Sequence, residues 1–416
     1  MHYGIIAQGT RGDVQPMVAL ATGLMKRNHQ VTVVAPENFK GFVEGFGIPF
    51  IPLTGNIEEI ARSPKALKLL KGGNILRFFY HYNKATEKIT EKANQEILEA
   101  SGEMDAYISS FIPFPIVYSI AEKYKKKCAM VYLSMPSTPT KDFPLPVFDV
   151  FDFPLFNKLS YKASFLFWML IRKQTNAFRK KLGLPLVNIW NKYIKSNVLT
   201  FYTMSNALIR RPDDWPSNTH ITGIFKLPAE KRDEHFMDKI PEGLEAWMQK
   251  GEKPIYIGFG SIPIPDPDKF RNILVDILNK TNERVILGLG WSILPDLPEH
   301  PNLFTVKYIN HDWLFPQLKM AVNHGGHGSM GSVLRGGIPI VILSILADQP
   351  YNGKLVERNN VGIHIPFNKI SSKKVLEAIK NVQNGSYAEN AKKIGEALKA
   401  EDGVNDAIDK IEAYFG

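Results

Sequence analysis

The sequence predicts an α/β protein with two Rossmann-like, doubly wound domains that face each other across a cleft. Short apolar runs alternate with helix-like segments twice along the chain, first from residue 3 and again from residue 254. The length of 416 residues also fits, because a domain usually contains about 100 to 200 residues. Hydrophobic residues make up 44% and charged residues 22% of the chain. These ordinary values exclude a largely disordered or fibrous protein.

The first series begins as a β-α-β unit. Residues 3–7 are apolar, a glycine-rich turn follows, residues 17–26 are amphipathic, and residues 31–35 are apolar and mostly β-branched. We expect two further strands and one long polar helix in this half, at residues 106–110, 129–133 and 84–100. Strands that alternate with helices indicate a parallel sheet covered on both faces.

Residues 141–190 are rich in aromatic side chains, with the runs FDVFDFPLF and SFLFWMLI. One interpretation is helical core packing. The other is an acceptor pocket or a surface for peripheral membrane contact, because exposed aromatic surface usually marks binding. Three prolines, Pro212, Pro216 and Pro228, then break regular structure. We place the interdomain linker at residues 225–241.

The second series repeats the layout of the first. We expect strands at residues 255–258, 284–289, 304–308, 321–323 and 338–343, and helices at residues 270–279, after Gly328 and at residues 371–382. The tail, residues 387–415, reads as helix interrupted at Gly403. The predicted units are therefore an N-terminal domain at residues 1–224, a C-terminal domain at residues 242–402 and a final helix at residues 403–416.

Charge and cysteine content narrow the function classes. Lys and Arg exceed Asp and Glu by 51 − 41 = 10, which favours acidic partners, anionic membrane surfaces or phosphorylated substrates. No aromatic-basic motif accompanies this charge, so we expect no nucleic-acid partner. The single cysteine, Cys128, allows no internal disulfide and fits a reducing compartment, the cytoplasm. The N-terminus reads as a buried strand rather than a signal peptide, and no apolar run reaches the length of a membrane span.

The most informative segment is AVNHGGHGSMGS, residues 321–332. Its glycines let the backbone approach a ligand, Ser329 opens a helix whose first amides favour an anion, and His324 can add a donor. A diphosphate is the expected occupant, and a tight strand-to-helix turn is the plain alternative. The segment also matches G-x-G-x-x-G at residues 326–331, with Asp348 further on, so a dinucleotide oxidoreductase is a rival interpretation.

Eight short motifs then carry a resemblance that spans nearly the whole chain. They are GTRGDVQP from Gly9, FRKKLGLP from Phe178, RRPDDWP from Arg210, GFGS from Gly258, GWS from Gly290, HDWLFP from His311, NHGGHGS from Asn323 and ADQP from Ala347. In this order they resemble the nucleotide-sugar-dependent glycosyltransferases of the GT-B fold. The branch they look most similar to holds sterol glucosyltransferases and bacterial natural-product glycosyltransferases.

The resemblance implies roles for named residues. His324, Gly326, Gly328 and Ser329 would hold the donor diphosphate, with Ser261 on the same side. Asp348 and Gln349 would bind sugar hydroxyls, and Trp291 and the backbone near Ile309 would hold the base; a core tryptophan is the alternative for Trp291. His327 replaces a small or apolar residue and is interpreted as filling space rather than contacting phosphate.

Asp13 is the candidate catalytic base, in the loop after the first strand. The resemblance assigns that role to the aspartate of G-D-V-x-P, and a cap of the following helix, starting near Val14 or Pro16, is the alternative. Thr10 and Arg11 lie beside Asp13 and would reach the donor phosphates.

Asp266 and Asp268 form a D-x-D sequence, but the prolines around it indicate a turn and a helix cap. We therefore expect no metal and no cofactor beyond the nucleotide sugar.

Together these features predict an inverting, metal-independent hexosyltransferase. It would move a sugar from a UDP- or dTDP-sugar to a hydroxyl of a lipophilic small molecule such as a flavonoid, polyketide or sterol. The resemblance also implies that the final helix returns to the N-terminal domain. A sugar-nucleotide-binding module without turnover is the non-enzymatic alternative. The sequence leaves the acceptor, the regiochemistry and the oligomeric state open.

Overall fold

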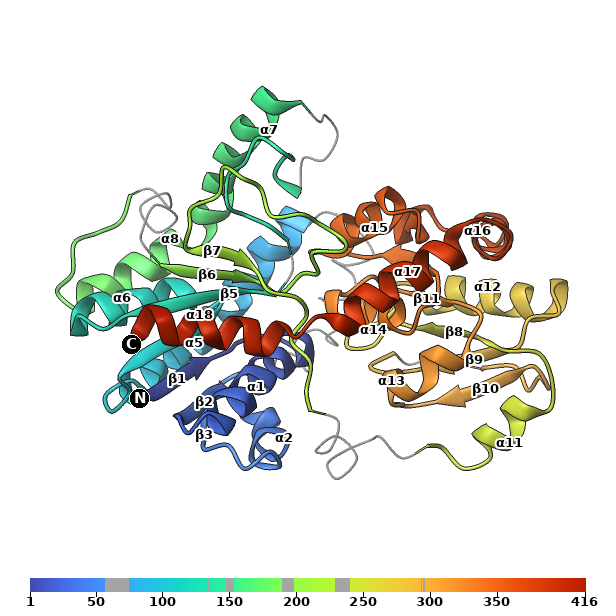
Figure 1. The fold of residues 1–416 in the computed structure, drawn as a ribbon, viewed down its shortest axis with the longest axis horizontal. Helices are drawn as coiled ribbons and strands as arrows, with labels where there is room; N and C mark the ends of the chain where they lie inside the picture. The colour runs from blue at the N-terminus through green and yellow to red at the C-terminus, as the bar shows by residue number, and fades with distance from the viewer. Residues whose placement is uncertain are drawn as a thin grey trace. The chain divides into compact units, whose positions relative to one another are not determined.

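The computed structural model describes residues 1–56, 75–133, 135–146, 153–188, 198–228, 240–292, 294 and 296–416, with residues 75–85 as backbone only (Figure 1). The chain forms two compact units. The first contains Met1–Ile57, Phe79–Lys231 and Asp402–Gly416, and the second is built mainly from Arg232–Glu401.

The first unit is a parallel sheet of seven strands in the order β3-β2-β1-β4-β5-β6-β7. The strands are β1 His2–Ile6, β2 Gln30–Pro36, β3 Phe50–Leu53, β4 Ala106–Ser110, β5 Cys128–Tyr132, β6 Leu199–Tyr202 and β7 Thr219–Ile221. Its helices are α1 Arg11–Lys26, α2 Lys40–Glu44, α5 Ile75–Ala100, α6 Phe114–Tyr124, α7 Pro154–Ser160, α8 Ser164–Lys181 and α18 Gly403–Phe415. In β1, Ile5 pairs with Val33 on one side and Ile108 on the other. The strand order reverses at β1, so the loop after β1 lies at a topological switch point.

The second unit is a parallel sheet of six strands in the order β10-β9-β8-β11-β12-β13. The strands are β8 Ile255–Gly258, β9 Val285–Gly288, β10 Leu303–Val306, β11 Ala321–Asn323, β12 Ile340–Ser344 and β13 Gly362–Pro366. The helices are α11 Leu244–Gln249, α12 Pro267–Lys280, α13 His311–Leu314, α14 His327–Arg335, α15 Gln349–Arg358, α16 Ser372–Asn384 and α17 Tyr387–Ala400. Here the order reverses between β8 and β11, which places the loops after these strands side by side.

The predicted fold class, two doubly wound α/β units, is confirmed. Four strands that the pattern did not predict are β3, β6, β7 and β13. Each is short or carries proline or histidine, so it lacks the apolar run that marks a central strand. Among the residues of the predicted linker, 229–239 lie outside the described part of the chain, as do residues 147–152 and 189–190 of the aromatic region.

The first helix is longer than predicted. The amphipathic pattern indicated a helix from residue 17, and the cap interpretation placed its start near Val14 or Pro16. The structure starts α1 at Arg11. Thr10 is its N-cap and Asp13 is the third helical residue, so the two form a capping box that satisfies the first amides.

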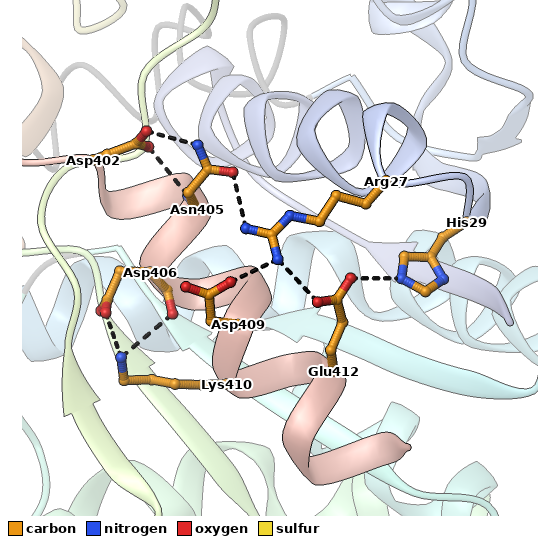
Figure 2. A network of polar contacts seen from close by, with 8 residues as sticks. All are labelled: Arg27, His29, Asp402, Asn405, Asp406, Asp409, Lys410 and Glu412. Atoms are coloured by element: carbon orange, nitrogen blue, oxygen red, sulfur yellow. Dashed lines mark hydrogen bonds and ion pairs between the residues drawn. The ribbon is translucent and has the colours of Figure 1, made fainter.

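The C-terminal helix α18 packs on α1 within the first unit, and Figure 2 shows the polar contacts between them. Ile408, Ile411 and Phe415 are buried in the core of that unit. Arg27 donates to Asp409 at 2.6 Å and to Glu412 at 2.9 Å, and His29 contacts Glu412 at 3.0 Å. The tail is interrupted as predicted, between α17 and α18.

Gly403 is the first residue of α18, rather than a kink within a helix. A Cβ at this position would lie 2.5 Å from the carbonyl oxygen of Gly223. Glycine is therefore needed because two backbone segments approach each other closely here. Within the described residues, no helix is both long and apolar enough to cross a membrane.

Candidate functional site

The glycine-rich loop of the second unit connects β11 to α14. Asn323 ends the strand, and its Oδ1 accepts a hydrogen bond from the Gly325 amide at 2.7 Å. Gly325 has φ +83°, a left-handed conformation that favours glycine. Gly326 is the N-cap of α14, and no side chain caps this helix. The first amides of α14, including that of Gly328, are therefore oriented as an anion site requires.

His324 lies under this loop, with only 6% of its surface exposed. Its Nε2 lies close to Gly326: a Cβ built on Gly326 would be 2.4 Å from this nitrogen. Its Nδ1 is buried and has no hydrogen-bond partner among the described residues. Burial and the neighbouring His311 lower the pKa of His324 to about 4. The imidazole is therefore neutral at pH 7, with one N–H to donate.

The loop after β8 lies next to His324 and Ser329. Gly260 has φ +57°, and a Cβ on it would lie 3.3 Å from Cε1 of His324 and 4.0 Å from Oγ of Ser329. Ser261 follows directly and is half-buried. Because β8 and β11 are neighbours in the sheet, the structure brings together five predicted residues, which are Ser261, His324, Gly326, Gly328 and Ser329.

Trp291 and Ile309 follow the next two strands. The Trp291 amide donates to the carbonyl oxygen of Gly260 at 2.9 Å, which joins the loops after β8 and β9. Its indole is 7% exposed, so in this structure it packs largely as a core tryptophan. Ile309 is half-buried, directly before Asn310, whose side chain caps α13.

Asp348 and Gln349 lie after β12, at the start of α15. Gln349 is buried, and its Oε1 accepts hydrogen bonds from the amides of Ile345 at 2.7 Å and Leu346 at 3.1 Å. This oxygen holds the loop before the helix. Asp348 is half-buried, and its Oδ2 accepts from Nδ2 of Asn352 at 3.0 Å.

Asn352 is a residue that the sequence reasoning missed. It is fully buried, and the Nδ2 that contacts Asp348 also donates to the carbonyl oxygen of Gly325 at 2.9 Å. It thereby connects the aspartate to the glycine-rich loop. The available signal was its place four residues after Asp348, on one face of a helix.

In the first unit, Asp13 serves the capping box of α1. Its Oδ2 accepts from the Thr10 amide at 2.7 Å and from the Thr10 hydroxyl at 3.1 Å. Gly9 has φ +139°, and a Cβ on it would lie 2.0 Å from that oxygen. Arg11 donates through Nε to Gln15 at 2.9 Å, and its guanidinium lies 5.1 Å from the centre of the Phe42 ring.

A row of stacked aromatic rings lies at the same edge of this sheet, at the carboxyl ends of β4, β5 and β6. Tyr132 stacks on Tyr202 at 4.7 Å and on Phe111 at 5.2 Å, and Phe111 stacks on Phe167 of α8 at 5.3 Å. Both tyrosines are buried, whereas Phe111 and Phe167 are half-buried and form the outer end of the row. The aromatic run of α8 was noted in the sequence, but its partners on the strands were not.

Asp266 is the N-cap of α12 and accepts from the Lys269 amide at 3.4 Å. The D-x-D sequence therefore includes a helix cap, as predicted. In the described ranges, no group of three or more His, Cys, Asp or Glu side chains is arranged to hold a metal ion.

Comparison with known proteins adds two family matches. Residues 3–134 match the glycosyltransferase family 28 N-terminal domain, and residues 272–413 match the erythromycin biosynthesis protein CIII-like C-terminal domain. The chain is 33% identical over its full length to a sterol 3-beta-glucosyltransferase of Arabidopsis thaliana, of which it covers 65%. It is 31% identical over 97% of its length to the sterol 3-beta-glucosyltransferase of Komagataella phaffii, of which it covers 34%. The chain thus spans about a third to two thirds of these relatives.

Solved structures share the fold at low sequence identity. The glycotransferase of kitacinnamycin superposes with a TM-score of 0.73 at 16% identity, over 100% of this chain and 99% of that one. The calicheamicin glycosyltransferase CalG4 superposes with a TM-score of 0.68 at 15% identity, over 100% of this chain and 98% of that one. SsfS6 of Streptomyces sp. SF2575, complexed with thymidine diphosphate, superposes with a TM-score of 0.62 at 18% identity, over 99% of each chain.

Proposed function

This chain belongs to the glycosyltransferases of the GT-B fold, as its sequence motifs predicted, and on that premise we propose that it transfers a hexose from a nucleoside diphosphate sugar to a hydroxyl of a lipophilic small molecule. The observation that carries this proposal is the cluster around the start of α14. An uncapped helix N-terminus, two glycine loops and a neutral buried histidine meet there.

The donor half of the proposed reaction is release of the nucleoside diphosphate. As the bond from the sugar C1 to the diphosphate oxygen breaks, negative charge grows on that oxygen. Amides at the start of α14 and the N–H of His324 would stabilise this charge, and preorganised donors of this kind are among the largest contributions to catalysis. Asp266 is occupied as a helix cap, which supports a reaction without a bound metal.

For activation of the acceptor hydroxyl, we propose a role for the loop after β1, which leads to Asp13. We propose that the acceptor hydroxyl oxygen attacks C1 from the face opposite the diphosphate, so that the configuration at C1 inverts. The hydroxyl proton passes to the Asp13 carboxylate as the new bond forms. The hydrogen bonds from Thr10 support this role because they hold the carboxylate in one orientation at the switch point of the sheet.

The aromatic row at the carboxyl ends of β4, β5 and β6 supports a lipophilic acceptor. Phe111 and Phe167 are partly exposed at the same sheet edge as Asp13. Flat apolar molecules gain from stacking on such rings. The relatives named above act on sterols by name, and a sterol is therefore the first acceptor to test.

For the donor, we propose UDP- or dTDP-hexose. One similar structure holds thymidine diphosphate, and two relatives are glucosyltransferases by name. Asp348 is the proposed partner of the sugar hydroxyls, and Gln349 is proposed to position it by holding the loop. The cytoplasm stays the predicted compartment, supported by the single, buried and free Cys128.

The test is a panel of donors and acceptors read by mass spectrometry. UDP-glucose and dTDP-glucose are each offered with a sterol, a flavonoid and a polyketide, and the anomeric configuration of the product is read by NMR. The proposal expects a hexose adduct and an inverted anomeric centre. Thermal shifts with UDP and with NAD separate it from the rival oxidoreductase, since a ligand of the native state raises Tm. Stabilisation by NAD alone, with no adduct from any donor, would contradict it.

A further inference from the structure

The helices α7 and α8 carry a group of exposed apolar side chains on the first unit. We call it the α7–α8 patch, and it consists of Phe153, Leu155, Leu159, Phe165, Leu166 and Met169. These side chains are between 43% and 70% exposed. Of the eleven exposed large hydrophobic residues in the described part of the chain, six lie here. Figure 1 shows α7 projecting away from the strands of this unit. Concentrated apolar exposure of this kind marks a binding surface.

The amphipathic pattern of α7 is inverted. Its buried residues are polar, Asn157 and Ser160, while Leu155 and Leu159 face solvent. The inner side chains are hydrogen-bonded: Nδ2 of Asn157 donates to the Lys141 carbonyl oxygen at 2.9 Å, and Oγ of Ser160 accepts from the Leu145 amide at 2.7 Å. These bonds hold the apolar face outward.

The start of α8, which follows α7 after one short 3-10 turn, also carries exposed apolar side chains. Trp168 is fully buried and donates through Nε1 to the Asn188 carbonyl oxygen at 3.3 Å. This anchor leaves Phe165, Leu166 and Met169 on the outside of the helix. The patch is therefore presented by two anchored helices rather than by a loop.

Within the helices that carry the patch, all charged residues are basic. Residues 154–181 contain seven Lys and Arg and no Asp or Glu. Toward the end of α8 these cations have carboxylate partners, as in the pairs Lys173–Glu87 and Lys181–Glu91. Lys158 and Lys162, next to the patch, are exposed and form no ion pair with any described residue. Apolar side chains flanked by exposed lysines match an anionic membrane surface.

We infer that the α7–α8 patch docks on an anionic lipid bilayer, with its apolar side chains at the boundary of headgroups and acyl chains and Lys158 and Lys162 on the headgroups. A second copy of this chain fits less well. A symmetric dimer through the patch would bring its lysines together, at a cost in like-charge repulsion. Docking places the enzyme where lipophilic acceptors accumulate, but it does not depend on the proposed reaction.

The test is co-sedimentation of the full chain with vesicles of phosphatidylcholine, with and without phosphatidylserine. Binding is expected on the mixed vesicles, and it should weaken with added salt. The double variant Lys158→Glu, Lys162→Glu should lose about 25-fold or more in partitioning, since each lysine near an anionic surface contributes about fivefold. The double variant Leu155→Ser, Leu159→Ser should lose at least about tenfold, through the apolar area no longer buried.

Matched controls come from the second unit. Ile240→Ser removes an exposed apolar side chain, and Lys392→Glu with Lys393→Glu reverses exposed charges; none of these residues belongs to the patch. These variants should partition like the wild type. Circular dichroism and turnover of a water-soluble acceptor report whether each variant is folded.

Three outcomes would overturn the inference. They are no binding to mixed vesicles, equal loss in the patch and control variants, and a concentration-dependent dimer that disappears in the leucine variant. If vesicle binding follows the expected pattern while no donor and acceptor pair reacts, the docking surface stands and the proposed function fails.

Discussion

Replacing His324 with alanine is expected to weaken donor binding while leaving the protein folded. The lost interaction is a hydrogen bond from the imidazole to a charged phosphate, which contributes about 1.5 to 3 kcal/mol. The dissociation constant of UDP-glucose should therefore rise by about 10- to 150-fold. Isothermal titration calorimetry measures this directly, with dTDP-glucose as the second donor.

The pKa of His324 makes the prediction sharper. Since burial lowers it from 6.5 to about 4, the ring binds the donor as neutral imidazole. Donor affinity should then stay level as the pH falls from about 8 to about 6. An intact nucleotide sugar is the right probe, because the terminal phosphate of a free diphosphate itself titrates in a range close to neutrality.

The same pKa affects stability. A histidine whose pKa is lowered in the native state stabilises it fully above about pH 6.5, and this contribution is lost as the pH falls toward about 4. The change in pKa corresponds to about 3 kcal/mol. His324→Ala should therefore make unfolding less sensitive to acid over that range. His220 in the first unit, with a pKa also lowered to about 4 by burial, is the matched control. His220→Gln should reduce acid sensitivity but leave donor affinity unchanged.

Two results would refute this reasoning. If folded His324→Ala binds UDP-glucose as tightly as the wild type, the imidazole does not contact the donor. The second result is a wild-type affinity for UDP-glucose that rises steeply as the pH falls through 6.5, together with loss of this rise in the alanine variant. The charged imidazolium of His324 would then be the form that binds, and the assignment of a neutral imidazole would be wrong.

The remaining predictions concern the base, the metal and the C-terminal helix. Asp13→Asn keeps an oxygen to accept from Thr10, so stability should change little while kcat for an alcohol acceptor falls about 10²- to 10⁴-fold; wild-type turnover would remove Asp13 from the role. EDTA should leave the rate unchanged, and a loss that Mg²⁺ restores would revive the D-x-D sequence at Asp266 as a metal site. Ile411→Ala, within the buried face of α18, should lower the free energy of unfolding in urea by about 2 to 5 kcal/mol. Arg27→Ala should lower the same free energy by at most about 1 kcal/mol, because Asp409 is 64% exposed. A larger loss in Arg27→Ala than in Ile411→Ala would show that ion pairs, not apolar burial, hold the helix.

Part of the candidate site could be predicted from the sequence because short motifs encode backbone geometry. Gly325 and Gly260 take left-handed conformations, and the loop that ends in Gly326 leads into an uncapped helix, so the pattern of residue types already implies an anion site. The parallel sheets were predictable for a similar reason, since the central strands are buried on both faces and read as apolar runs. The edge strands β3 and β7 lack such runs and were missed.

The hydrogen-bond partners of individual polar side chains were beyond the sequence. Gln349 and Asn352 are polar residues whose type suggests ligand contact, yet the structure uses Oε1 of Gln349 to hold its own loop and Asn352 to connect Asp348 to the Gly325 carbonyl oxygen. A hydrogen bond needs partners within about 3 Å, and that proximity depends on where β11 and β12 lie in the sheet.

By itself the sequence determined the two α/β series, the glycine loops, the family and the excess of positive charge, because each depends on residue type at short spacing. Only the tertiary structure decided that Asp13 and Thr10 form a capping box and that α7 has its leucines outward. The burial of Ile408 and Ile411 of α18 in the first unit agrees with the return of the final helix that the resemblance implied. The physical reason is that burial is a property of the folded chain. Large apolar side chains stabilise a core in α18 and lie open to solvent in α7, according to what packs against each helix.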